Sequence, residues 1–298
     1  MNYKKLGTSD LHISNIGFGC MSLKTDQAEN EKIIHQALEY GINYFDTADL
    51  YDKGMNEISL GKAFKGIREK VVIATKVGNQ WRSDGSGWDW NPTKAYILAA
   101  VEESLKRLQT DYIDLYQLHG GTIDDPIDET IEAFETLQQQ GKIRYYGISS
   151  IRPNVIREYV SRSRIVSVMM QYSLLDRRPE ESCLPLLQQH NIGVLARGSV
   201  ASGLLVDKSA KNYLNYTAEQ VSAARNTVRQ LSAQNRSAAQ TAIQFVLQHQ
   251  AITAAVVGIR TTAQLKDAAE TLSVPQLTDA EYEQLVNAVD PNYYTDHR

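Results

Sequence analysis

Tyr44-Phe-Asp-Thr-Ala-Asp-Leu-Tyr51 is the stretch of this sequence that decides the predicted fold. It begins with apolar residues, reaches Asp46 and continues to Tyr51 five residues later. We expect a short buried strand that ends at Asp46, followed by a loop that carries Tyr51. Both side chains can then point into one cavity, so the segment predicts a functional site at a strand end.

Two later apolar runs also end at a titratable residue. Val71-Val-Ile-Ala-Thr-Lys76 ends at Lys76, and Tyr112-Ile-Asp-Leu-Tyr-Gln-Leu-His119 ends at His119. The parallel strands of a barrel place the residues at their C-terminal ends around one mouth, where the active sites of such barrels lie. We therefore expect the three titratable residues to meet at the mouth of a parallel barrel.

The rest of the chain alternates between apolar, strand-like runs and longer stretches with helical periodicity. This alternation predicts an α/β protein with a (β/α)8 TIM barrel, preceded by an N-terminal β-hairpin at 3–13. Further helical stretches at 217–234 and 278–289 predict extra C-terminal helices, and we expect one barrel domain over 1–298. The barrel strands are expected near 16–19, 43–46, 71–75, 112–118, 145–149, 166–170, 193–196 and 254–257.

Two of the expected helices carry clear start signals. Asp26 is placed to cap a helix at 27–40, and Thr278-Asp-Ala-Glu281 is a capping-box pattern at the start of the last helix. The final residues 291–298 contain no such signal. They form either a loose tail or a cover over the site.

Composition narrows the class of protein. The 298 residues are 42% hydrophobic and 22% charged, with a net charge of −4, so nothing favours nucleic acid or an anionic membrane surface as a partner. The two cysteines, Cys20 and Cys183, are too few and too far apart for a disulfide framework or a thiolate metal site. With no apolar signal core and no run long enough to span a bilayer, we expect a cytoplasmic protein.

Asp46, Tyr51, Lys76 and His119 resemble, in order and spacing, the catalytic tetrad of the aldo-keto reductases. The resemblance covers nearly the whole chain, and no single motif carries it alone. The flanking sequence motifs that match the family are Asn15-Ile-Gly-Phe-Gly19, Gly41-Ile-Asn-Tyr-Phe-Asp-Thr-Ala48, Gly141-Lys-Ile-Arg-Tyr-Tyr-Gly-Ile-Ser149 and Gln171-Tyr-Ser-Leu-Leu175.

The resemblance implies reduction of an aldehyde or ketone to an alcohol with NADPH and without a metal. The cofactor supplies a hydride, and the protein must supply a proton donor aimed at the carbonyl oxygen. Tyr51 is the expected donor, because the nearby ammonium of Lys76 favours its phenolate form. Asp46 is expected to hold Lys76 in place, while His119 orients the carbonyl oxygen and shares in proton transfer.

The family pattern also assigns expected cofactor contacts. Since Gly17-Phe-Gly19 lacks the third glycine of a dinucleotide fingerprint, these contacts rest on the barrel mouth and on the resemblance. Arg260 in the last βα loop is expected to bind the 2′-phosphate, near a helix N-terminus that favours anions. The complete expected set is Cys20, Met21 and Asp46 near the nicotinamide; Ser149 and Gln171 at its carboxamide; Arg197, Gly198, Ser199, Val200 and Gly203 in the loop after strand seven; and Gly258, Arg260 and Gln264 at the adenosine end.

The sequence departs from the family at three of these places. Ser150 stands where Asn commonly follows Ser149, and Ala268 stands where the family often has Asn. Arg197 falls where an aromatic residue usually stacks on the nicotinamide, and a planar guanidinium can also stack on a ring. The orientation of the cofactor is therefore expected to differ from the usual one.

The segment 80–90 is rich in glycine and holds all three tryptophans of the chain, Trp81, Trp88 and Trp90. It follows the third strand, so it is expected to be a loop at the catalytic face. Aromatic side chains there suggest a wall of the carbonyl-substrate site or a lid. Packing over the adjacent helix is the alternative.

Simpler interpretations exist for each residue taken alone. A strand-end aspartate such as Asp46 is often a turn former, and residues such as Lys76, Arg197 and Arg260 are often solvated surface groups. Two other functions are also open: a regulatory module that senses a bound nicotinamide, and an unrelated barrel enzyme acting on phosphorylated substrates. The histidines offer no metal-ligand spacing, and the physiological substrate and oligomeric state do not follow from the sequence.

Overall fold

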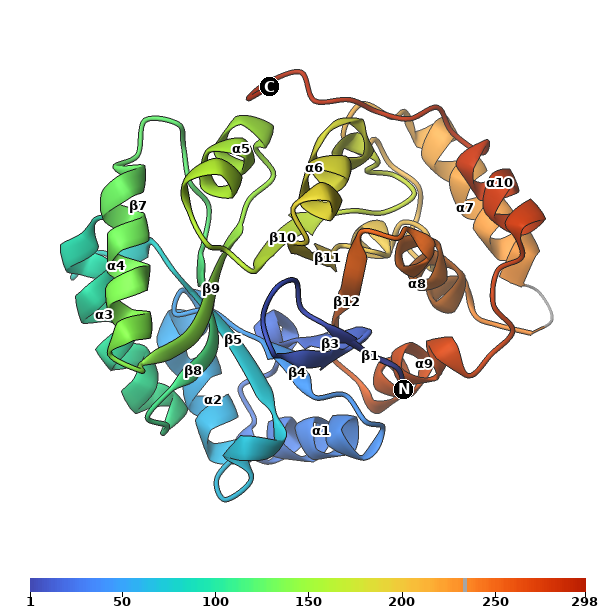
Figure 1. The fold of residues 1–298 in the computed structure, drawn as a ribbon. Helices are drawn as coiled ribbons and strands as arrows, with labels where there is room; N and C mark the ends of the chain where they lie inside the picture. The colour runs from blue at the N-terminus through green and yellow to red at the C-terminus, as the bar shows by residue number, and fades with distance from the viewer. Residues whose placement is uncertain (233–234) are drawn as a thin grey trace.

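The computed structural model describes residues 1–232 and 235–298, and its centre is a closed barrel of eight parallel strands (Figure 1). Strands that are consecutive in the barrel are neighbours along the chain, and the last pairs with the first, so the predicted (β/α)8 TIM barrel is confirmed. The strands are β3 (Ile16–Gly19), β4 (Tyr44–Asp46), β5 (Val72–Val77), β8 (Ile113–Leu118), β9 (Ile143–Ser149), β10 (Ser167–Gln171), β11 (Gly193–Arg197) and β12 (Ile252–Gly258).

The predicted N-terminal hairpin is present and closes one end of the barrel. Strands β1 (Tyr3–Lys5) and β2 (His12–Ser14) pair antiparallel, and β1 lies across the barrel end that faces the viewer in Figure 1. Leu6 and Leu11 of the hairpin turn are buried among apolar side chains from the barrel interior. Because this plug fills the end where the strands begin, the opposite end is the open mouth.

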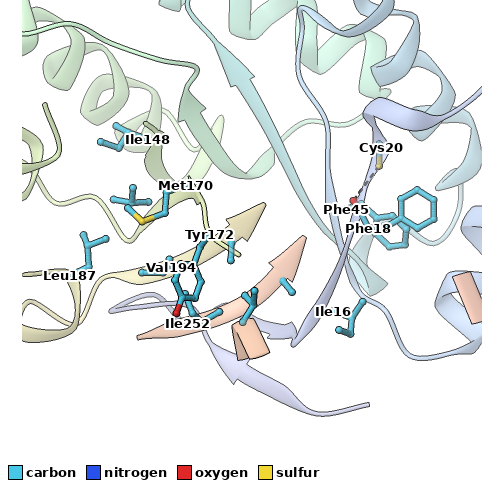
Figure 2. Close-up of a cluster of buried hydrophobic side chains, with 14 of the residues drawn as sticks. Ile16, Phe18, Cys20, Phe45, Ile148, Met170, Tyr172, Leu187, Val194 and Ile252 are labelled. Atoms are coloured by element: carbon cyan, nitrogen blue, oxygen red, sulfur yellow. Dashed lines mark hydrogen bonds between the residues drawn. The ribbon is translucent and has the colours of Figure 1, made fainter. Parts of the chain in front are cut away.

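Helices surround the barrel, as a (β/α)8 fold requires. Their inner faces pack on the outward side chains of the strands, where Phe18 and Phe45 stack with ring centroids 5.7 Å apart (Figure 2). The α-helices are α1 (Gln27–Glu39), α2 (Met55–Ala63), α3 (Lys94–Leu108), α4 (Ile127–Gln139), α5 (Pro153–Arg162), α6 (Cys183–Gln189), α7 (Ala218–Ser232), α8 (Ala238–Gln248), α9 (Thr262–Ala269) and α10 (Asp279–Val286). Short 3₁₀ helices are η1 (Cys20–Ser22), η2 (Tyr51–Gly54), η3 (Arg68–Lys70), η4 (Arg178–Glu181), η5 (Ala201–Gly203) and η6 (Glu270–Leu272).

The predicted helix caps are confirmed. The Asp26 side chain accepts a hydrogen bond from Glu29 N at 3.1 Å, and Thr278 and Glu281 form a reciprocal capping box. The extra C-terminal helices are α7 and α10. α10 ends at Val286, before the predicted 289, and the predicted residues 233–234 of the earlier helix lie outside the described part of the chain.

The tryptophan-rich segment was expected as a loop, and that prediction is wrong. It is a small antiparallel hairpin of β6 (Asn79–Trp81) and β7 (Trp88–Trp90), in which Trp81 pairs with Trp88. Trp81 and Trp88 lie directly opposite each other in this hairpin, and cross-strand aromatic pairs of this kind stabilise a sheet.

The C-terminal residues 291–298 are fastened to the outside of the barrel. The carbonyl of His297 accepts a hydrogen bond from Asn154 N at 2.8 Å, at the start of α5. The guanidinium of Arg178 lies 5.0 Å from the centre of the Tyr294 ring. The tail is therefore not loose. Within residues 1–232 and 235–298, no helix has the length and apolar character needed to cross a membrane.

Candidate active site

A cavity of about 1180 Å³ lies at the open mouth of the barrel, where the strands end. Asp46 is the last residue of β4, Lys76 lies one residue before the end of β5, and His119 follows β8 directly. Tyr51 begins η2 in the loop after β4. All four side chains line this cavity, so the meeting of the four predicted residues is observed.

Lys76 is at the centre of the group and is fully buried. Its Nζ donates to Asp46 Oδ1 at 2.5 Å, to the carbonyl of Thr47 at 2.7 Å and to Tyr51 Oη at 3.4 Å. An ammonium group has three N–H donors, so each donor has one acceptor. The ammonium is therefore held rigidly beside the phenol oxygen.

Burial and neighbouring charges set the protonation states of two of the four residues, Lys76 and His119. Burial alone would lower the pKa of Lys76, but the charge of Asp46 and the hydrogen bonds to Asp46 and Tyr51 raise it above its usual value. Burial, together with the positive charges of Lys76 and Arg197, lowers the pKa of His119 to about 3. At neutral pH the site thus contains an ammonium and a neutral imidazole.

His119 lies beside Tyr51 in the wall of the cavity. Its ring lies 5.7 Å from the Tyr51 ring, centre to centre, at an interplanar angle of 82°. Its Nδ1 is buried and has no hydrogen-bond partner among the described residues. A neutral imidazole can donate one N–H but is a poor acid at neutral pH, which leaves Tyr51 as the better-placed acid.

Gln117 is a site residue that the sequence analysis missed. It lies in β8, and its Nε2 donates to Asp46 Oδ2 at 3.3 Å. The second oxygen of the Asp46 carboxylate is therefore also engaged. A signal existed, because Gln117 precedes His119 by two residues and so faces the same side of the strand.

A second buried charged group supports the loop that carries Tyr51. Glu57 Oε2 accepts from Arg107 Nε at 2.7 Å, and its other carboxylate oxygen accepts from Thr75 Oγ1 at 2.6 Å. Asp49 is buried close to this pair, and burial together with the charge of Glu57 raises the pKa of Asp49 to about 8. The base of the Tyr51 loop is thus fixed by buried polar contacts between α2, α3 and β5.

Most of the predicted cofactor and substrate residues lie in the wall of the same cavity. They come from η1 after β3, from the ends of β9 to β12 and the loops that follow, and from the tryptophan hairpin after β5. Besides the four central residues, the predicted residues in the wall are Met21, Ser149, Gln171, Arg197, Gly198, Val200, Gly203, Gly258, Arg260, Gln264, Trp88 and Trp90.

Cys20, Ser199 and Trp81 do not line the cavity, in contrast to what the sequence analysis led us to expect. Cys20 is fully buried, and its thiol donates to the carbonyl of Phe18 at 3.6 Å within the outer apolar core (Figure 2). Ser199 is buried at the turn after β11. The Trp81 ring packs under the Lys53 ammonium, which is 5.2 Å from its centre. A role in ligand binding for these side chains stays a prediction without a geometric basis.

Gln171 and Arg197 form a small network on the β10 and β11 side of the cavity. Arg197 Nη1 donates to Gln171 Oε1 at 3.0 Å, and Gln171 Nε2 donates to Tyr213 Oη at 2.8 Å. Both ends of the Gln171 amide are therefore engaged. Arg197 is exposed, so its guanidinium is accessible from the cavity.

At the β12 end of the same side of the cavity lies the start of α9. Thr261 caps the helix by accepting from Gln264 N at 3.2 Å, and Gln264 Oε1 accepts from Arg260 N at 2.9 Å. The exposed Arg260 side chain also borders a second cavity of about 250 Å³, which includes Lys24 and Lys32. This end of the mouth is positively charged and contains a helix N-terminus, a combination that favours anions.

Several wall residues were not predicted from the sequence. Arg152, Lys208 and Tyr213 line the cavity, but they come from the loops that follow β9 and β11 and lie outside the motifs that mark the strand ends. Residues 291–298, which are all described, contribute nothing to the wall. Within the described parts of the chain, no cluster of three or more His, Cys, Asp or Glu residues is arranged to hold a metal ion.

Comparisons with known proteins agree with this architecture. The sequence model of the Aldo/keto reductase family matches residues 15–290. The chain is 50% identical to the "Uncharacterized oxidoreductase YqkF" of Bacillus subtilis, with 100% of both chains covered. It is also 36% identical to the "Aldo-keto reductase YhdN" of the same organism, over 72% of this chain and 66% of that protein.

Solved structures show the same relation. The aldo-keto reductase AKR11C1 from Bacillus halodurans, in its holo form, has a TM-score of 0.94 and 51% identity, with 100% of this chain and 99% of that chain covered. The glycerol dehydrogenase AKR11B4 from Gluconobacter oxydans has a TM-score of 0.86 and 25% identity, with 98% and 99% covered. The barrel, the four residues at its mouth and these matches lead to one conclusion: the chain belongs to the aldo/keto reductase family of oxidoreductases.

Proposed function

We propose that the protein reduces aldehydes or ketones to alcohols with NADPH, with Tyr51 as the proton donor. The observation that carries the proposal is the contact of Lys76 Nζ with Asp46 Oδ1 at 2.5 Å and with Tyr51 Oη at 3.4 Å. It supplies a fixed positive charge beside a phenol that faces a large cavity. Membership of an oxidoreductase family supports the proposal.

The residues at the mouth suit a dinucleotide with a 2′-phosphate. Arg197, Lys208 and Arg260 line the β11 and β12 side of the cavity, and none of them is within salt-bridge distance of a carboxylate in the described structure. Cations of this kind favour phosphate oxygens through charge-assisted hydrogen bonds. Arg260 would hold the 2′-phosphate near the start of α9, and the nicotinamide would lie by Gln171 and Arg197.

When bound, NADPH supplies the hydride. Tyr51 Oη then donates its proton to the carbonyl oxygen, and the phenolate that forms is stabilised by the ammonium of Lys76. Asp46 keeps Lys76 charged and in position. His119, which is neutral because of its lowered pKa, donates a hydrogen bond that orients the carbonyl oxygen.

Other parts of the proposal follow from the family rather than from a contact. The partner is a small-molecule carbonyl compound, and the reaction takes place in the cytoplasm. Two free, buried cysteines agree with a reducing compartment.

The test is Tyr51→Phe, which removes one hydroxyl and keeps the ring. NADPH binding and the melting temperature should be retained, while kcat for a reactive aldehyde should fall about 10²–10⁴-fold, the usual contribution of general acid catalysis. Lys76→Met should also suppress turnover, because it removes the ammonium and leaves Asp46 buried without its cation. Tyr40→Phe, at the far end of α1, is the matched control and should react at the parental rate.

A folded Tyr51→Phe protein that binds NADPH and reduces aldehydes at the parental rate would refute the proton-donor assignment. If the parental protein binds NADPH but reduces no aldehyde, ketone or sugar, the regulatory function considered in the sequence analysis is favoured instead.

A further inference from the structure

Arg152 is a cation of the cavity wall that the proposed reaction does not use. It follows β9 and immediately precedes α5. Its Nη1 donates to the carbonyl of Gly121, which is two residues beyond His119. Two residues of chain span at most about 7 Å between Cα atoms, so the guanidinium is within the length of a small substrate from His119.

The charge of Arg152 is not neutralised by a nearby acid. In the described structure no carboxylate lies within salt-bridge distance of it, and the bond to Gly121 engages one of its five N–H donors. The nearest acidic group around Gly121 is Asp125, whose carboxylate accepts from Thr122 N at 2.7 Å and from Trp90 Nε1 at 2.9 Å. Asp125 keeps its negative charge, but it makes these hydrogen bonds to Thr122 and Trp90 and no salt bridge with Arg152, so the Arg152 fork has donors left for a ligand.

The wall near His119 and Arg152 contains an aromatic ring beside polar residues such as Asn79, Thr122 and Ser150. A Cβ atom at Gly120 would lie 3.4 Å from the Trp90 ring, which shows how closely the ring covers this strip of backbone. Trp88 and the partly exposed Ile151 also line the cavity. This half of the mouth thus offers a polar reacting end at His119, apolar side chains that a substrate can pack against, and a cation at Arg152.

The other unpaired cations of the wall lie elsewhere. Arg197, Lys208 and Arg260 follow β11 and β12, whereas Arg152 lies beside the loop after β8. In the proposed function those three face the phosphates and ring of the cofactor, which leaves Arg152 for the substrate.

We propose that the preferred substrates are aldehydes or ketones with an apolar body and a carboxylate at the end remote from the carbonyl, and that Arg152 binds this carboxylate. The planar guanidinium fork matches a carboxylate in two parallel hydrogen bonds. The inference rests on the proposed carbonyl reduction, and names its substrate class.

The experiment compares two aldehydes of similar shape, 4-carboxybenzaldehyde and 4-methylbenzaldehyde, with the full-length protein and NADPH. The readout is the ratio of their kcat/KM values, so that differences in intrinsic reactivity cancel between variants. Arg152→Gln should lower the ratio at least tenfold, mainly through a higher KM for the carboxylated aldehyde, since a hydrogen bond to a charged group contributes about that factor. Arg152→Lys should lower it less, because it keeps the charge and loses the fork.

Arg157→Gln is the matched control. Arg157 is an exposed arginine of α5, the helix that follows Arg152, and it does not line the cavity, so its loss removes the same charge without the proposed contact. Its ratio should equal the parental one. Melting curves and NADPH affinity report whether each variant is folded. If Arg152→Gln is not folded, the comparison is made with Arg152→Lys.

Each outcome decides a different question. Reduction of both aldehydes with the same ratio in the parental protein and the Arg152 variants overturns the inference and leaves the proposed reduction intact. An equal fall of this ratio in Arg157→Gln also overturns the inference, because a long-range electrostatic effect would then explain the preference for the carboxylated aldehyde. If the parental protein reduces neither aldehyde, the proposed function and the inference both fail.

Discussion

The neutral state of His119 makes a quantitative prediction for the pH dependence of stability. Its pKa in the folded protein is lowered from 6.5 to about 3 by burial and by the charges of Lys76 and Arg197. As the pH falls below 6.5, the unfolded chain takes up a proton at this residue and the folded chain does not. Protons therefore favour unfolding, and stability is lost as the pH falls from 6.5 toward 3.

The size of the effect follows from the two pKa values. Between pH 7 and pH 5 the imidazole of the unfolded chain becomes almost fully protonated, and the linkage relation gives a loss of about 2 kcal/mol from this one residue. His119→Gln removes the titrating group and keeps a polar side chain at the cavity wall. The parental protein should therefore lose about 2 kcal/mol more unfolding free energy than His119→Gln over this pH range.

The assay is urea-induced unfolding of the cofactor-free proteins at pH 7, 6 and 5. His190→Gln, at an exposed position after α6, is the control and should follow the parental protein. NMR gives an independent measurement, because the His119 ring signal, identified by its loss in His119→Gln, should not shift between pH 8 and pH 5. A His119 signal with a midpoint near pH 6.5, or parallel stability curves for the parental protein and His119→Gln, would refute this account of the site.

Three other changes test other parts of the structure. Arg260→Ala should weaken NADPH binding about tenfold or more and leave NADH binding nearly unchanged, because it removes the proposed charge-assisted contact to the 2′-phosphate; equal losses for both cofactors would reject this assignment. Trp88→Ala and Trp90→Ala should change the preference among carbonyl substrates, whereas Trp81→Ala should change it little, since only the first two line the cavity. If Trp88→Ala and Trp90→Ala both keep the parental preference among substrates, the hairpin has a structural role only. Arg107→Met should lower the unfolding free energy by about 3–5 kcal/mol because it leaves Glu57 buried without its cation. Lys106→Met, in an exposed pair with Glu103, should have little effect, and a similar loss in both would contradict this reasoning.

The sequence predicts this fold well because strands that are buried on both faces are strongly apolar. Most barrel strands are short apolar runs; Lys76 lies near the end of one and His119 directly follows another, so strand ends and site coincide. The hairpin that holds Trp88 was missed because its strands have three residues each, too few for a clear alternation.

Long-range contacts explain what the sequence does not predict at the site. Gln117 bonds to Asp46 across 71 residues of chain, and Arg152 contacts Gly121 across 31. Neither contact corresponds to a local pattern in the sequence. The burial of the Cys20 side chain was also not predicted, because the backbone at the end of β3 turns into η1 and directs the thiol into the outer core.

The position of Tyr51 depends on structure that lies outside the barrel strands. The three residues after it, Asp52, Lys53 and Gly54, have φ values of 48°, 53° and 86°, and the first two are strained because they have side chains. A Cβ atom at Gly54 would lie 2.7 Å from the Arg107 side chain, so the backbone turn packs directly on the partner of Glu57. Strained turns persist only where their surroundings fix them, and here the buried ion pair of Arg107 does so. The strand ends therefore fix the ammonium of Lys76, while the buried pair of Arg107 and Glu57 fixes the loop that brings the Tyr51 phenol to it. Loss of the ammonium or of the buried pair should suppress turnover. Only loss of the buried pair should also destabilise the Tyr51 loop.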